Sequence, residues 1–151
     1  MSNKLSLSVQ YASVARELPT RAQFRRWIKV ALQHDANITL RIVDEPEGRE
    51  LNRNYRGKDY STNVLTFVYD DAEPCDARPL LGDVVLCAPV VAQEAATQHK
   101  DLLAHYAHLV IHAALHLQGY EHDSDTDAAG METLETALML KLHYPDPYLA
   151  V

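Results

Sequence analysis

Hydrophobic and polar positions alternate in some segments of the chain and recur every three to four residues in others. Leu5, Leu7 and Val9 alternate with two serines, which predicts a half-buried strand. Runs rich in β-branched and apolar residues predict three further strands, so that the expected strands cover residues 5–9, 38–43, 63–69 and 80–87. The polar stretch 70–79 contains two prolines and predicts a loop.

Helical spacing of apolar residues and capping signals predict five helices. Thr20 is expected to cap a helix that carries apolar residues from Phe24 to Leu32, and Asp101 to cap another. Either Asp123 or Ser124 is expected to cap the last helix. The helix that Asp101 caps is expected over residues 102–118, and the other two expected helices cover residues 45–55 and 89–99.

These elements mix strands and helices without a strict alternation. We therefore expect a single α+β domain over residues 1–151, a small mixed four-stranded sheet with about five helices packed on it. A chain of 151 residues can bury such a core without disulfides, and its two cysteines, Cys75 and Cys87, are too few for a disulfide scaffold. We find neither a signal-peptide pattern nor an apolar run long enough to span a membrane, so we expect a cytoplasmic protein with no membrane partner.

Charge is distributed unevenly along the chain. The formal net charge is −7, but residues 1–58 contain eleven Lys or Arg against six Asp or Glu, a balance of +5. Residues 59–151 contain three against fifteen, a balance of −12. Such asymmetry is compatible with contact to a polyanion, although it also arises when charges simply cover solvated faces.

Three histidines mark the candidate chemistry. His112 and His116 lie four residues apart on a predicted helix, so both rings project from one face. Gly119 permits a left-handed turn that can bring His122 back toward the same point. Three imidazoles with one open position are the arrangement of a catalytic zinc site, although imidazole also suits copper, nickel and iron.

Two alternatives surround this triplet. His105 and His108 continue the same helical stripe, so His108 and His112 could form the pair instead; otherwise His108 only lines the site or supports it, or is a partly buried surface histidine. The spacing also matches the long zinc-protease pattern, but Ala113 stands where that pattern has its glutamate general base. A protease is therefore disfavoured, and the metal itself or a group from elsewhere must activate water.

The sequence HAALHLQGYEH over residues 112–122 resembles the signature of the bacterial YbeY family of endoribonucleases and ribosomal RNA maturation factors. Three more segments are similar to that family in the same order: 51–59 (LNRNYRGKD), 62–67 (TNVLTF) and 81–84 (LGDV). The resemblance runs from about residue 40 to residue 140. It departs from the family pattern at Ser61, Ala113 and Glu121, of which the last places metal affinity in question.

The resemblance implies a zinc-hydrolase-like fold with one Zn2+ on His112, His116 and His122. It implies cleavage of single-stranded RNA, maturation of the 16S ribosomal RNA 3′ end, ribosome quality control in the cytoplasm, and contact with the ribosome or its proteins. It also implies a functional arginine, which falls on Arg56. A guanidinium and a zinc ion aimed at a phosphate both suit phosphodiester cleavage, because negative charge builds up on the phosphate oxygens.

Two other classes of function remain open from the sequence. One is a metal hydrolase that acts on peptides or small molecules. The other is a ribosome-assembly factor with a structural zinc, which usually has four protein ligands, and Glu121 or Asp123 could supply the fourth.

Overall fold

The strands of the described chain pair into one mixed sheet in the order β1-β2-β4-β3. β1 (Leu5–Ala12), β2 (Ala36–Val43) and β4 (Leu80–Cys87) are parallel, and the short β3 (Val64–Val68) runs antiparallel to β4 at one edge. The computed structural model describes residues 3–69, 79–120 and 124–149. It therefore confirms the expected four-stranded mixed sheet, while the expected loop falls almost entirely outside the described residues.

Five helices accompany the sheet in the part of the chain that the structure describes, which confirms the α+β class. They are α1 (Arg21–Ala31), α2 (Glu45–Arg56), α3 (Ala88–Thr97), α4 (Leu102–Leu117) and α5 (Asp125–Lys141). Among the described helices, none has the length and apolar character that crossing a membrane requires.

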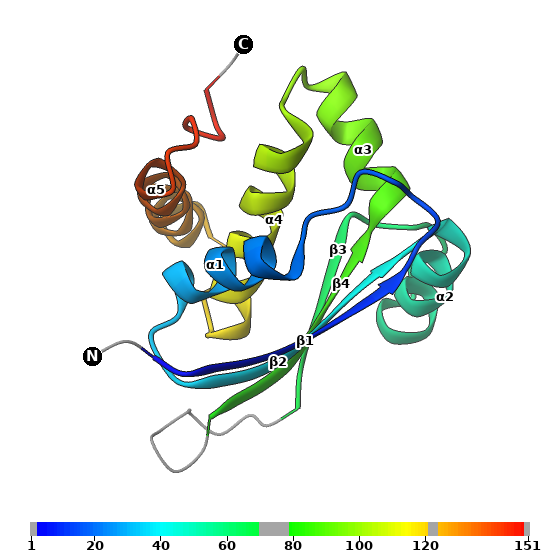
Figure 1. Ribbon diagram of the computed structural model, residues 1–151, viewed down its shortest axis with the longest axis horizontal. Helices are drawn as coiled ribbons and strands as arrows, with labels where there is room; N and C mark the ends of the chain where they lie inside the picture. The colour runs from blue at the N-terminus through cyan, green and yellow to red at the C-terminus, as the bar shows by residue number, and fades with distance from the viewer. Residues whose placement is uncertain (1–2, 70–78, 121–123, 150–151) are drawn as a thin grey trace.

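The helices cover the two faces of the sheet unequally. Helices α1, α4 and α5 gather on one side of the sheet, and α2 lies on the other (Figure 1). Alternate residues of β4 show the same division, because Val84 and Leu86 belong to the main core, whereas Val85 and Cys87 belong to a smaller cluster with Leu51 of α2. The side of the sheet that α1, α4 and α5 cover therefore contains the main hydrophobic core.

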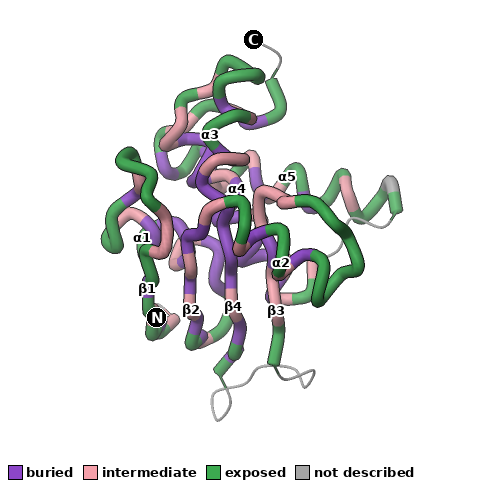
Figure 2. Tube along the Cα trace, turned by 90° about the vertical axis from the view of Figure 1, so that its right-hand side faces the viewer, coloured by how far each residue is buried: buried purple, intermediate pink, exposed green. Residues whose placement is uncertain are grey.

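Helix α4 lies at the centre of that core, packed against α1, α3, α5, β3 and β4. Eleven of its sixteen residues are buried. Purple, the colour of buried residues, accordingly marks much of α4 in Figure 2. Such burial follows from a helix that is apolar on nearly every side. Beyond its first turn, its partly exposed positions are His108, His112 and His116, each one turn after the last.

Local signals set the element ends. Thr20, Asp101 and Ser124 each accept a backbone N–H at the start of a helix, as expected, whereas Asp44 instead accepts the hydroxyl of Ser13 and the N–H of Val14. β1 extends three residues beyond the expected end because it pairs with β2 along its whole length. Such pairing is non-local and leaves no mark in the β1 sequence itself.

Candidate metal centre

His112 and His116 project from the same side of α4, as the sequence predicts. Their ring centroids lie 6.3 Å apart and their planes differ by only 6°. Both side chains are partly exposed at the surface of an otherwise buried helix. The two imidazoles can therefore face one ligand in a shared orientation.

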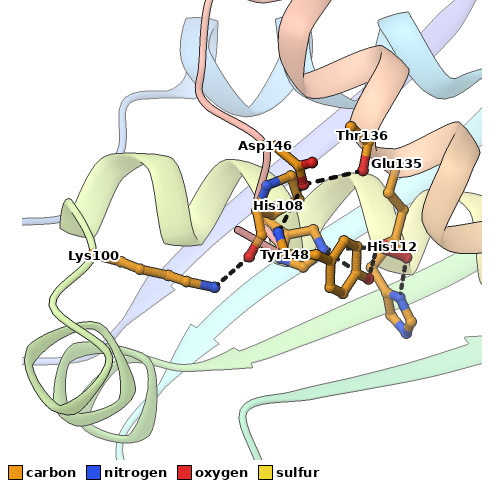
Figure 3. A network of polar contacts seen from close by, with 8 residues as sticks. Lys100, His108, His112, Glu135, Thr136, Asp146 and Tyr148 are labelled. Atoms are coloured by element: carbon orange, nitrogen blue, oxygen red, sulfur yellow. Dashed lines mark hydrogen bonds and ion pairs between the residues drawn. The ribbon is translucent and has the colours of Figure 1, made fainter. Parts of the chain in front are cut away.

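A carboxylate from α5 fixes the His112 ring. Glu135 is fully buried, and its Oε1 lies 2.6 Å from His112 Nδ1. Its other oxygen lies 2.7 Å from His108 Nε2 and accepts the hydroxyl of Tyr148. Figure 3 shows these three donors converging on the one carboxylate.

These hydrogen bonds determine the charge of Glu135. Burial alone would raise the pKa of its carboxyl group, but hydrogen bonds from His108, His112 and Tyr148 outweigh burial and lower the pKa to about 2. The group is therefore a carboxylate at neutral pH and can only accept hydrogen bonds. His112 Nδ1 must then carry the proton, so in the neutral ring Nε2 has the lone pair.

A backbone carbonyl fixes the His116 ring in the same way. His116 Nδ1 lies 3.1 Å from the carbonyl oxygen of Tyr120, which can only accept a hydrogen bond. Gly119, with φ of 99°, makes the left-handed turn that brings this carbonyl back over the last turn of α4. The Tyr120 hydroxyl is itself held by the side-chain amide of Gln33, 2.6 Å away.

Both rings thus carry their proton on Nδ1 and the lone pair on Nε2. An imidazole whose other nitrogen donates to a carboxylate or a backbone carbonyl is the usual form of a histidine that binds a metal. The donor set of His112 and His116 therefore fits Zn2+. The buried Glu135 carboxylate and the Tyr120 carbonyl are the outer contacts that orient such ligands.

Two histidines alone do not complete a zinc site. In residues 3–69, 79–120 and 124–149, no group of three or more His, Cys, Asp or Glu side chains could hold a metal ion. The predicted third ligand, His122, lies outside the described residues, as do Glu121 and Asp123. The structure therefore brings together two of the three predicted ligands, and the third stays a prediction.

The two earlier histidines of the stripe have other partners. His108 bonds Glu135, so it supports the carboxylate that orients His112. His105 is buried, its Nε2 lies 3.0 Å from Glu94 Oε1, and the amide of Asn63 also donates to that carboxylate. Burial lowers the pKa of His105 more than Glu94 raises it, so this ring favours its neutral form.

Arg56 belongs to a different element from the two histidines. It occupies the last position of α2, a helix that packs on β4 and α3, and its side chain is exposed. Two neighbouring cations are occupied, because Arg49 bonds both carboxylate oxygens of Asp59 at 2.9 and 3.0 Å and Arg53 lies 3.9 Å from the same group. Arg56 forms no such ion pair within the described chain, and its role in catalysis stays a prediction.

Sequence reasoning missed Glu135 and Tyr148. The available signal for Glu135 was its position among Met131, Leu134 and Leu138, where a charged residue interrupts the apolar stripe of a helix. Nothing local marks Tyr148, because its contact with Glu135 depends on how the last residues fold back.

Comparison with known proteins places this α+β domain with its histidine pair among nucleases. The family model described as Endoribonuclease YbeY matches residues 8–143. Curated proteins named Endoribonuclease YbeY are 58% identical in Nitrosospira multiformis, over 96% of this chain and 82% of the relative, and 55% identical in Thiobacillus denitrificans, over 98% and 99%. The chain belongs to the YbeY family.

One solved structure shares the fold. The solution structure of TM1509 from Thermotoga maritima superposes with a TM-score of 0.56, covers 95% of this chain and 99% of that protein, and is 20% identical in sequence. At this level of identity the likeness concerns the fold alone.

Proposed function

We propose that this chain is a zinc-dependent endoribonuclease that cleaves single-stranded ribosomal RNA. Its substrate would include the precursor of the 16S 3′ end, and it would act in ribosome maturation and quality control in the cytoplasm, in contact with the ribosome. The observation that carries the proposal is the pair of histidines with both Nδ1 protons held, in a chain whose family is named for endoribonuclease activity.

The residues of this chain would divide the work between holding the metal and binding RNA. His112, His116 and His122 would hold Zn2+, which when bound would polarise a phosphate oxygen or supply hydroxide. Glu135 keeps the proton on His112 Nδ1, and the Tyr120 carbonyl does the same for His116. These contacts hold both rings in one orientation and one tautomer before any ligand arrives.

Arg56 would bind the phosphate. Its guanidinium is exposed, while Arg49 and Arg53 lie beside Asp59, so it is better placed than they are to pair with an incoming anion. A planar guanidinium can donate two hydrogen bonds to a phosphate and offset the charge that builds up during cleavage.

The test of the proposal compares RNA cleavage with bound zinc. Protein stripped with a chelator should not cleave single-stranded ribosomal RNA, and added Zn2+ should restore cleavage, as read from the fragment pattern. His116→Ala should lose zinc and cleavage together, whereas His34→Ala, which changes an exposed histidine outside the site, should keep both.

Each other result has a defined meaning. Cleavage by a metal-free His116→Ala protein would contradict the proposal. Zinc bound by the wild type without any cleavage would instead favour an assembly factor with structural zinc.

Arg56→Gln should separate RNA binding from metal binding. We expect zinc affinity to stay unchanged and cleavage to fall about a hundredfold, the loss typical of removing one donor to a developing oxyanion. A plot of the logarithm of the RNA-binding constant against the logarithm of salt concentration should have a slope less negative by about 0.7, since one phosphate contact is lost. Lys141→Gln, an exposed cation at the end of α5, is the matched control, and equal behaviour of the two variants would refute the role of Arg56.

A further inference from the structure

The last described residues fold back over the histidine face of α4. We call residues 145–149 the C-terminal strap. Lys100, from the turn between α3 and α4, donates to the carbonyl of Pro147 at 2.7 Å. Asp146 accepts the N–H of Tyr148 at 2.8 Å and the hydroxyl of Thr136 on α5 at 3.4 Å (Figure 3). The strap is therefore held from two other parts of the chain.

This anchoring places Tyr148 against both His108 and Glu135. Its ring meets the His108 ring edge to face, with centroids 5.2 Å apart and planes at 84°. Its hydroxyl donates to Glu135 Oε2 and lies 3.3 Å from His108 Nε2. Burial and the bond to Glu135 both raise the pKa of Tyr148, so the hydroxyl keeps its proton and remains a donor.

The Glu135 carboxylate is the point where these contacts converge. Its side chain is 1% exposed, so water can do little to stabilise its charge. Oε2 has two donors, His108 and Tyr148, while Oε1 bonds His112. Removal of one donor would leave buried charge less well compensated and would free the carboxylate to rotate away from His112.

We propose that Tyr148 is a positioning residue: through Glu135, the C-terminal strap holds the His112 ring in the orientation and tautomer that a metal requires. This inference rests on the proposed function in taking His112 as a ligand, but it concerns the contacts behind that ligand. Residues 145–149 would thereby influence metal affinity, although they supply no ligand themselves.

Tyr148→Phe tests the inference, because it removes the hydroxyl and keeps the ring that packs on His108. Tyr11→Phe is a matched control, since Tyr11 is 40% exposed against 45% for Tyr148 and its hydroxyl also donates a hydrogen bond, here to the Pro19 carbonyl at 2.7 Å. Zn2+ affinity of the full chain is measured by competition with a chelator. Ring-nitrogen chemical shifts of His112 are measured by NMR in the metal-free protein, where they report the tautomer.

We expect Tyr148→Phe to weaken Zn2+ binding about tenfold, at the low end of the effect of outer contacts to a metal ligand. The His112 nitrogen shifts should move toward a mixture of tautomers, and Tyr11→Phe should change neither quantity. Unchanged affinity and shifts in Tyr148→Phe would overturn the inference, as would equal changes in both variants.

Failure of the proposed function would look different. Wild-type protein that binds no Zn2+ would refute the zinc proposal, yet the metal-free NMR comparison would still decide whether Tyr148 positions His112.

Discussion

At the scale of single residues, the centre depends on a carboxylate buried beneath the histidines. A buried anion is costly unless hydrogen bonds surround it, and Glu135 has donors on both oxygens. In return it determines which nitrogen of His112 carries the proton. Glu135 therefore orients the ring whose far nitrogen, Nε2, we propose as a metal ligand.

Glu135→Gln should weaken Zn2+ binding by about ten- to a hundredfold, because a neutral amide of the same size holds the His112 proton less firmly. Chelator competition measures the change, with a denaturation curve to show that the variant folds. Glu132→Gln, an exposed change on the same helix, should leave the affinity alone. If both variants bind zinc like the wild type, Glu135 does not support a metal ligand.

Contacts between residues close along the chain could be predicted from the sequence, whereas contacts between distant residues could not. The His112 and His116 pair could be predicted because a four-residue spacing on a helix fixes one face. Glu135 lies 23 residues from His112, and the sequence does not say which faces of two helices meet. His108 could be placed near the site but not assigned a partner for the same reason. The role of Arg56 came from the resemblance alone, and the structure leaves it untested.

At the scale of elements, α4 is a buried helix with one partly exposed stripe, and its end is set by Gly119. Gly119 and Gly130 form a natural comparison. Both have open space where a Cβ would lie, but Gly119 has φ of 99°, whereas Gly130 lies inside α5. Only the backbone conformation separates the two sites.

Gly119→Ala should lower the free energy of unfolding by about 1 kcal/mol, because a Cβ is strained in the left-handed region. Gly130→Ala should raise it by about 1 kcal/mol, because alanine is the better residue inside a helix. Urea denaturation of the metal-free proteins measures both. Shifts of the same sign would contradict the account of how α4 ends.

Element identity was easier to predict than element pairing. Caps at Thr20, Asp101 and Ser124 act within three residues, so the sequence shows them directly. The position of β4 between β2 and β3, and the antiparallel direction of β3, depend on segments far apart along the chain. No local pattern specifies such pairing.

At the scale of the molecule, helices pack on both faces of the sheet, and ion pairs reduce the cationic charge that the fold exposes. Residues of α4 belong to the main core on one face, and Leu51 of α2 belongs to the smaller cluster on the other. The basic balance of residues 1–58 is partly cancelled in the fold, since Arg41 pairs with Glu47 and Arg49 with Asp59. The +5 balance of residues 1–58 therefore overstates the cationic surface that RNA meets, and we expect fewer cations, Arg56 among them, to bind it.

The most direct test of a zinc-dependent endoribonuclease is cleavage of single-stranded ribosomal RNA as metal-free protein is titrated with Zn2+. We predict that the cleavage rate rises in proportion to bound zinc and levels off at a single equivalent per chain. A full cleavage rate without zinc, or no cleavage by fully loaded protein, would contradict it.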